Sequence, residues 1–195
     1  LLAGGLDNHL LRLYGAERLE SARIRCVGVI SGFTKAFGCP PESLFSAPGR
    51  TELGGNHTDH QHGRVLAAGV DLDILAAASP NQSGMIRIQS EGYPLLVVDL
   101  HELSPQPEER NTSAALIRGV AARLSALGCP LQNAGLDAYL VSDVPGGSGL
   151  SSSAAFEVLI GTILNALFWD GKCSPVEIAQ IGQYAENVFF GKPCG

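Results

Sequence analysis

The segment Asp143–Ala155 constrains the fold most, because three glycines and three consecutive serines stand directly before a long apolar stretch. Glycine lets a backbone turn tightly and lets a ligand approach it closely. Serines satisfy backbone N–H groups at a helix start, where unpaired donors and a partial positive charge gather. This glycine-serine loop (residues 143–155) therefore predicts either a phosphate-binding cradle or a turn before an ordinary serine-capped helix.

Three common glycine-rich motifs do not fit this loop. A P-loop requires lysine after its last glycine, whereas Leu150 follows Gly149 and the next lysine is Lys172. The dinucleotide-binding fingerprint requires a third glycine where Ser152 stands, and the nucleophile elbow requires a glycine in place of Leu150. A phosphate site here is consequently of another kind.

Composition excludes several classes of protein. A chain of 195 residues with 45% hydrophobic and 16% charged residues is expected to fold, as one substantial domain or two small ones. The net charge of −6 argues against a nucleic-acid partner, whose binding surface would be basic. The apolar run Val158–Trp169 falls short of the about 20 residues that span a bilayer, and no signal peptide is visible, so no membrane partner is expected.

The cysteines indicate a compartment. The chain has 5 cysteines, an odd number without a Cys-x-x-Cys pair. This usage is typical of reduced thiols, so we expect a cytoplasmic protein. The sequence leaves the oligomeric state open.

Residue patterns predict an α+β fold. Helices are expected at 6–38, 111–127, 150–169 and 174–190, and strands at 44–47, 70–79, 85–90, 95–100 and 136–142. The first strands are expected to form a meander, followed by helices interleaved with one more strand. The helix at 150–169 is apolar nearly all round, which predicts a central, buried position that fixes the glycine-serine loop.

A second polar segment, residues 46–63, is expected to be a loop. It gathers six side chains that bind ligands in many proteins: Arg50, Glu52, His57, Asp59, His60 and His62. The order of the histidines and the aspartate differs from the His-x-His-x-Asp-His pattern of metallo-hydrolases, which disfavours a catalytic zinc site. A polar surface loop and a sugar site, built from directional donors and acceptors, remain the other interpretations.

Three segments together resemble one family. Residues 48–59 are similar to the galactokinase signature, residues 144–155 to the nucleotide loop of the GHMP kinases, and residues 186–195 to the third galactokinase segment. The matches occur in the family's order and at its spacings. The resemblance implies a GHMP-kinase N-terminal domain over 1–195, with a mixed β-sheet packed with helices like domain 2 of ribosomal protein S5.

The resemblance also implies a reaction, in which ATP and galactose give galactose 1-phosphate and ADP. Arg50 would be catalytic, and Ser152 and Glu186 would hold Mg²⁺. The sugar would contact Asn56, His57, Asp59 and Gly195. ATP would contact the backbone and hydroxyls of the glycine-serine loop: Pro145, Gly146, Gly147, Ser148, Gly149, Leu150, Ser151, Ser152 and Ser153.

The chain departs from the family pattern in ways that bear on function. Asn56 stands where galactokinases have Glu, His60 replaces Tyr, and Thr51-Glu52 replaces Val-Asn. The family's catalytic Asp lies three residues beyond the position of Gly195. We therefore expect the N-terminal portion of a longer kinase, inactive by itself and without the C-terminal domain. The alternatives are a GHMP kinase for another sugar and a non-catalytic sugar sensor.

Overall fold

The computed structural model describes residues 5–55 and 63–194. Its helices are α1 (Asp7–Tyr14), α2 (Leu19–Phe37), α3 (Ser113–Ala126), α4 (Ser152–Trp169) and α5 (Pro175–Tyr184). Its strands are β1 (Ser43–Gly54), β2 (Leu66–Asn81), β3 (Met85–Ser90), β4 (Leu96–Asp99) and β5 (Gly135–Ser142). A 3-10 turn at Pro107–Glu109 precedes α3, and a π-helical segment at Ala185–Phe190 continues α5.

The five strands form one mixed sheet in the order β1-β2-β5-β3-β4. β5 is antiparallel to β2 and parallel to β3, and the outer pairs are antiparallel. The predicted mixed α+β architecture is confirmed, but the predicted meander is wrong, because β5 lies between β2 and β3. The parallel pairing requires a long crossover, which β4 and α3 supply.

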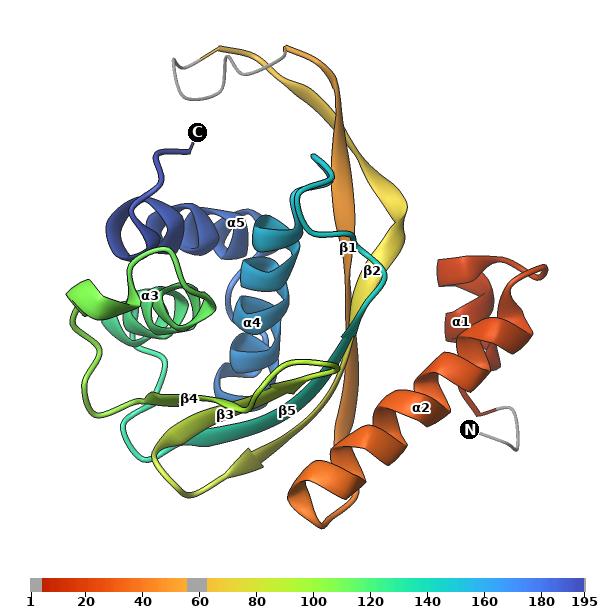
Figure 1. Cartoon of the computed structure of the whole chain (residues 1–195), viewed down its shortest axis with the longest axis horizontal. Helices are drawn as coiled ribbons and strands as arrows, with labels where there is room; N and C mark the ends of the chain where they lie inside the picture. Colours follow the sequence, from red (N-terminus) through yellow and green to blue (C-terminus); the bar gives the residue numbers. More distant parts are fainter. Residues whose placement is uncertain (1–4, 56–62, 195) are drawn as a thin grey trace.

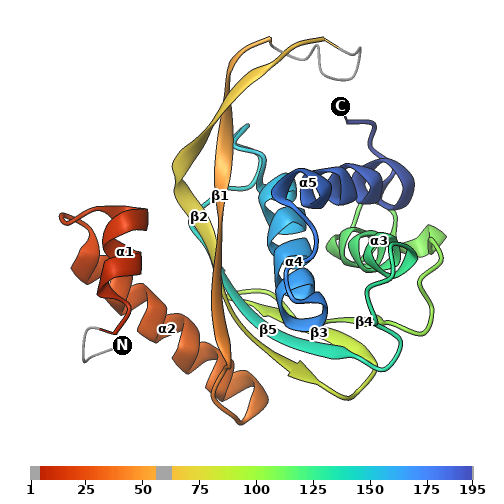
Figure 2. The ribbon, with the colours of Figure 1, turned by 180° about the vertical axis from the view of Figure 1, so that it is seen from behind.

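Helices cover both faces of this sheet. α1 and α2 lie on one side of β1 and β2, and α3, α4 and α5 lie on the other (Figures 1 and 2). A small core on the first side joins Cys26, Val29 and Phe33 of α2 to Leu75 and Ala77 of β2. The second side holds the larger core.

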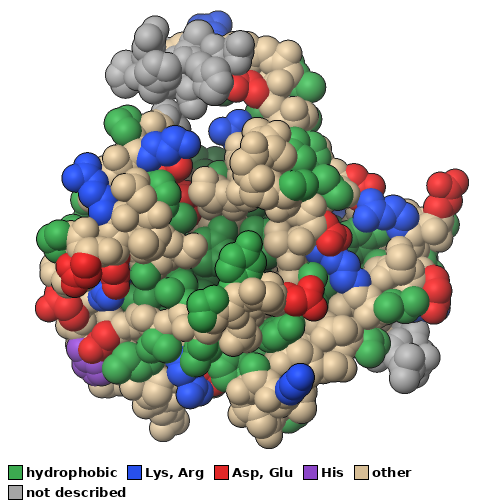
Figure 3. Space-filling model, viewed as in Figure 1, with side chains coloured by type: hydrophobic (Ala, Val, Ile, Leu, Met, Phe, Trp, Pro, Cys, Tyr) green, Lys and Arg blue, Asp and Glu red, His purple; other side chains and the backbone are tan. Residues whose placement is uncertain are grey.

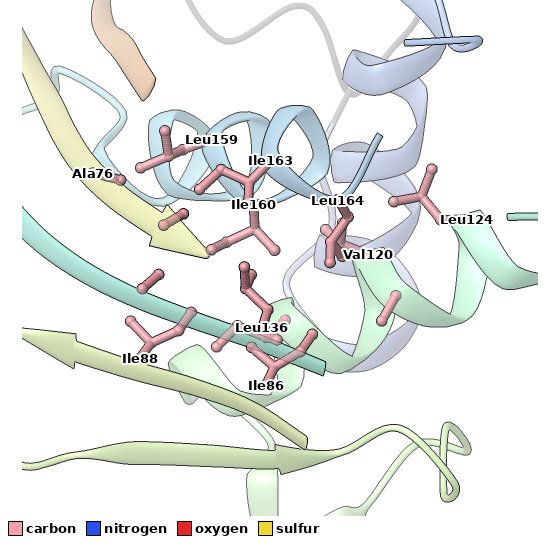
Figure 4. Close-up of a cluster of buried hydrophobic side chains, with 14 of the residues drawn as sticks. Ala76, Ile86, Ile88, Val120, Leu124, Leu136, Leu159, Ile160, Ile163 and Leu164 are labelled. Atoms are coloured by element: carbon pink, nitrogen blue, oxygen red, sulfur yellow. The ribbon is translucent and has the colours of Figure 1, made fainter. Parts of the chain in front are cut away.

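α4 is the centre of the larger core. Its side chains Leu159, Ile160, Ile163 and Leu164 are fully buried, and they face β2, β3, β5 and α3 (Figure 4). Each such side chain contributes about 1.5–3 kcal/mol through burial. The predicted central helix is confirmed. By length and hydropathy it is also the one helix in the described ranges that could cross a membrane, a property that buried core helices share.

Local sequence signals set several helix ends. Gly38, at φ 78°, ends α2 in the left-handed conformation, and the Thr112 hydroxyl accepts a hydrogen bond from Ala115 N at the start of α3. Ser174 and Glu177 form a capping box at the start of α5, where the predicted helix 174–190 begins. The predicted helix 6–38 is interrupted, because Gly15 ends α1 at φ 75°.

β1 differs most from its prediction. A strand was expected only at 44–47, yet β1 continues to Gly54, paired throughout with β2. Register shifts fall between Pro48 and Arg50 and between Glu52 and Gly54. A bulge accommodates Pro48, which has no N–H for a ladder, so the strand passes through a segment whose residues signal a loop.

The two interior glycines of α2 provide a matched test of this packing. A Cβ at Gly32 would lie 2.3 Å from Tyr139 Cε1 on β5, whereas a Cβ at Gly28 would meet nothing within 4 Å. We expect Gly32→Ala to lower the free energy of unfolding by about 1–3 kcal/mol through overpacking. Gly28→Ala should raise it by up to about 1 kcal/mol through helix propensity. Urea denaturation measures both, and equal effects would contradict the assigned α2–β5 contact.

Candidate functional site

β1 brings Arg50 to the glycine-serine loop. The backbone N–H of Arg50 donates a hydrogen bond of 3.0 Å to the Leu150 carbonyl oxygen. The neighbouring position requires glycine, since a Cβ at Gly49 would lie 3.0 Å from that oxygen and 3.1 Å from Val144 Cγ1. The strand therefore lies directly against the loop at this point.

The glycine-serine loop uses its small residues as expected. Gly147 and Gly149 have φ of 71° and 79°, in the region that favours glycine, and Ser151 also has φ of 57°. The Ser148 hydroxyl donates to the Pro145 carbonyl at 2.7 Å and accepts from Leu150 N at 3.4 Å. Three positive φ values in five residues give a tight turn that ends at α4.

The serine-capped helix, one of the two alternatives for this segment, is not what the structure shows. Ser151 occupies the N-cap position in a left-handed conformation and makes no side-chain capping bond. A helix N-terminus concentrates unsatisfied N–H groups and a partial positive charge. Without that cap, the first-turn amides of this 18-residue helix are suited to an anionic ligand.

A cavity of about 400 Å³ gathers most of the predicted site residues. The predicted site residues that line this cavity are Arg50, Gly147, Ser148, Gly149, Ser151, Ser152, Ser153 and Glu186. The space-filling view shows a hollow between the β1–β2 ribbon and the C-terminal helices (Figure 3). Pro145, Gly146 and Leu150 belong to the loop but do not line this cavity.

The sequence interpretation did not assign five other residues of this cavity to the site: Glu52, Ala154, Lys192, Pro193 and Cys194. Gly191, at φ 85°, ends the π-helical segment. The Asn187 side chain then holds residues 192–194, the tail: its Oδ1 accepts from Cys194 N at 2.7 Å, and its Nδ2 donates to Cys194 O at 3.1 Å. The tail thereby places Lys192 at the cavity, where an ammonium group complements phosphate.

Another cavity, of about 430 Å³, lies on the outer side of α3 and α5. It is lined by Arg123, Tyr184 and Asn187 among others, and none of the predicted site residues line it. The Arg123 guanidinium stacks on the Tyr184 ring at 5.3 Å from its centroid. The two cavities are similar in size. Of the two, the cavity beside Arg50 is the one that combines a helix N-terminus with the loop glycines and the buried Glu186 carboxylate.

Glu157 is a buried carboxyl group that the sequence interpretation overlooked. It is the one charged residue on α4, its side chain is 3% exposed, and its Oε1 has no hydrogen-bond partner. Burial, and secondly the charge of Glu186, raise the pKa of Glu157 to about 8. Gly182 makes room for it, because a Cβ there would lie 3.1 Å from Glu157 Oε2. A protonated carboxyl group therefore lies near Glu186 at neutral pH, although it does not line the cavity.

The donor set fits Mg²⁺. The Ser152 hydroxyl and the Glu186 carboxylate line one cavity, and Mg²⁺ takes oxygen ligands, keeps several waters and shares phosphate oxygens. Among residues 5–55 and 63–194, no cluster of three His, Cys, Asp or Glu side chains could hold a metal ion. A site of two protein oxygens completed by a nucleotide agrees with this chemistry.

The predicted sugar-binding residues lie outside the described residues. These are Asn56, His57, Asp59 and Gly195, and His60 and His62 of the zinc interpretation lie there too. Residues 56–62 fall between Gly54, where β1 ends, and Leu66, where β2 begins. Both the sugar and the zinc interpretations of this segment stay predictions.

Comparisons with known proteins agree with these features. Residues 31–80 match the model "Galactokinase galactose-binding signature", and residues 115–195 match "GHMP kinases N terminal domain". A galactokinase of Lacticaseibacillus casei is 36% identical over 168 residues, covering 86% of this chain and 43% of the relative. A Streptomyces coelicolor galactokinase is 36% identical over 163 residues, covering 84% and 41%. The chain thus spans less than half the length of these relatives.

Solved structures show the same fold. Lactococcus lactis galactokinase complexed with galactose superposes with a TM-score of 0.77 and 26% identity, covering 87% of this chain and 44% of that one. Methanococcus jannaschii mevalonate kinase gives a TM-score of 0.63 at 20% identity, over 77% and 48%. The resemblance predicted from three sequence segments is confirmed.

The raised pKa of Glu157 predicts a pH dependence of stability. A carboxyl with a folded pKa of about 8 and an ordinary unfolded pKa contributes stability fully below the unfolded pKa. That contribution is lost as the pH rises toward 8. We expect Glu157→Gln to stabilise the fold relative to wild type by an amount that grows by about 3 kcal/mol between pH 5 and pH 8.

Urea unfolding in chelating buffer at several pH values measures this effect. Glu177→Gln is the control of opposite sign, because hydrogen bonds from Ser174 hold the pKa of Glu177 below its ordinary value. Its loss of stability should shrink as the pH falls. A pH-independent difference for Glu157→Gln would show that this carboxyl does not titrate as the burial requires.

Proposed function

We propose that a protein carrying this chain, which has the galactokinase galactose-binding signature followed by the GHMP kinase N-terminal domain, phosphorylates galactose with ATP. The transfer would join the γ-phosphoryl group of ATP to the anomeric hydroxyl. One observation carries this proposal: Arg50, the glycine-serine loop and Glu186, which come from distant parts of the chain, line one cavity. We place the reaction in the cytoplasm, on the pattern of cysteines.

The glycine-serine loop is assigned to the phosphates of ATP. Its positive-φ glycines let a ligand approach the backbone, and the N-terminus of α4 adds oriented amides and a partial positive charge. Local N–H groups suffice to bind an anion, so the negative net charge of the chain does not oppose nucleotide binding. Lys192 adds a cationic side chain at the same cavity.

Ser152 and Glu186 are assigned to Mg²⁺. Bound with ATP, the ion would neutralise charge on the phosphate oxygens during transfer. Of the two residues, Glu186 is held on the π-helical segment, whose carbonyl oxygen at Glu186 accepts from Gly191 N at 2.9 Å and Lys192 N at 3.2 Å. The carboxylate is thus carried by a backbone whose hydrogen bonds fix its position.

Arg50 is assigned to the transferred group. A guanidinium beside the reacting hydroxyl stabilises the charge that develops on the phosphoryl oxygens. Its backbone bond to Leu150 ties it to the loop that would hold the phosphates, so positioning and electrostatics act together. We propose that an aspartate, on the pattern of the family, accepts the hydroxyl proton.

The sugar itself is assigned to the loop containing Asn56, His57 and Asp59, with Gly195. The relative from Lactococcus lactis was solved with galactose, which supports galactose as the substrate. Asn56 favours a second candidate, a GHMP kinase for another sugar, because an amide has a donor as well as an acceptor and carries no charge. Turnover on galactose, N-acetylgalactosamine, galacturonate and arabinose by the complete gene product separates the two. Phosphorylation of none would overturn both and leave the sugar sensor.

Variants of the loop and the sugar segment should separate the two substrates. We expect Ser152→Ala to lower kcat/KM for Mg-ATP about tenfold or more, because a metal ligand is lost, without changing calorimetric galactose affinity. Asp59→Ala should weaken calorimetric galactose affinity and have a smaller effect on the use of Mg-ATP. Ser31→Ala, on the far face of the sheet, is the control.

Equal loss of nucleotide use and sugar binding by Ser152→Ala, with the fold intact, would count against the assignment. Stoichiometric zinc in the purified protein would instead favour a hydrolase built on the histidines of residues 57–62.

A further inference from the structure

A buried polar network joins the N-terminal helices to the glycine-serine loop. At its centre is Asp73 of β2, a carboxylate only 5% exposed. The Tyr14 hydroxyl of α1 donates to its Oδ2 at 2.5 Å, the Ser46 hydroxyl of β1 donates to the same oxygen, and Arg25 of α2 donates to Oδ1. Three elements thus converge on one side chain.

Arg25 extends this network to the loop. Its Nη2 donates to the Asp73 carbonyl oxygen at 3.0 Å, and its Nε lies 3.1 Å from Oδ2 of Asp143, the first residue of the loop. Asp143 N also donates to that carbonyl oxygen, at 2.9 Å. The Nε contact is an ion pair without hydrogen-bond alignment. The guanidinium therefore bridges a carboxylate in the sheet and a carboxylate at the loop's start.

The network is charged at neutral pH. Burial raises the pKa of Asp73, but hydrogen bonds from Ser46, Tyr14 and Arg25 outweigh burial and hold it below its ordinary value. Burial, and secondly the hydrogen bond to Asp73, raise the pKa of Tyr14 to about 12, so the phenol remains a donor. A buried ionised carboxylate is tolerated only when it is paired, which makes Arg25 necessary for Asp73.

Asp73 lies beside both functional segments of the sheet. On one side it pairs with Pro48, immediately before the bulge that leads to Arg50. On the other side the next residue, Ile74, pairs with Ser142, the last residue of β5. The loop is thus held at Asp143 by the network and at Leu150 by the Arg50 N–H.

We propose that Arg25 and Asp73 are positioning residues, which set the glycine-serine loop against Arg50 through Asp143. The pair of helices α1 and α2, whose remaining contacts only cover the far face of the sheet, then contributes to ligand binding on the opposite side. The role in nucleotide affinity rests on the proposed function, whereas the restraint on the loop does not.

The neighbouring ion pair between Arg18 and Asp71 is a matched control. It links the N-terminal helices to the same strand, and its side chains are 41% and 65% exposed. The Arg18 guanidinium also lies over the Tyr14 ring, 5.9 Å from its centroid, but its side-chain hydrogen bonds go to Asp71 and not to Asp143 or the loop. Arg18→Gln therefore removes an arginine–aspartate pair between the same elements without releasing the loop.

Hydrogen–deuterium exchange measures the restraint directly. In the absence of ligand, Arg25→Gln and Asp143→Ala should each speed exchange of the amides of residues 143–150 about fivefold, and exchange in α3 should not change. Arg25→Lys should not restore protection, since one ammonium cannot bridge both carboxylates. The variant that carries both Arg25→Gln and Asp143→Ala should exchange no faster than Arg25→Gln alone, because both substitutions remove the same contact between Arg25 and Asp143.

Calorimetry with Mg²⁺ and AMP-PNP measures the consequence for the ligand. Arg25→Gln and Asp143→Ala should weaken affinity about fivefold, and Arg18→Gln should leave it unchanged. Asp143 does not line the cavity, so a direct contact does not explain its effect. If Arg25→Gln fails to fold, the Asp143→Ala variant decides. The Asp143 side chain is 40% exposed, and its removal leaves the hydrogen bonds to Asp73 in place.

Two results would overturn the proposal. Unchanged exchange of residues 143–150 in Asp143→Ala would mean that the network does not restrain the loop. Equal loosening by Arg18→Gln would mean that any loss of an ion pair on this face has the same effect. A wild-type chain that binds no Mg²⁺–AMP-PNP would refute the nucleotide function, while exchange still decides whether the restraint exists.

Discussion

The burial of α4 against the sheet is the constraint on which the site depends. Leu159, Ile160, Ile163 and Leu164 are fully buried, so the helix has little freedom to shift or rotate. Its first turn is consequently fixed, and with it the end of the glycine-serine loop. The same helix carries Glu157 next to Glu186. A core helix thus positions the anion-binding end of the cavity. It also positions the buried Glu157 carboxyl group, whose pKa the charge of Glu186 raises.

The other walls are positioned by contacts between distant segments. Gly49 lets β1 approach the loop closely enough for the Arg50 N–H to reach Leu150 O, and Gly191 turns the tail so that Lys192 returns to the cavity. Asp73 and Arg25 fix the start of the loop from the opposite face. The cavity therefore depends on two glycine positions and one buried ion pair, none of which belongs to α4 itself.

The sequence predicted features that depend on neighbouring residues. The end of α2 near residue 38, the start of α5 after Ser174 and the apolar character of α4 all follow from patterns within one segment. It failed where distant pairing decides: β5 inserts between β2 and β3, and β1 continues past Pro48 because β2 pairs with it. Glu157 and Asp73 were missed for the same reason, since a single carboxylate within an apolar pattern does not reveal its partners. A serine-capped start of α4 is absent because Ser151, at the N-cap position, is left-handed and makes no side-chain capping bond.

The central claim is that the cavity between Arg50, the N-terminus of α4 and Glu186 binds a nucleotide with Mg²⁺. An amide NMR titration of this chain with Mg²⁺ and AMP-PNP tests it most directly. We predict that the largest shift changes fall at residues 147–154, at Glu186 and at residues 192–194, and that they require Mg²⁺. Shift changes centred on Arg123 and Tyr184, or none at saturating nucleotide, would contradict it.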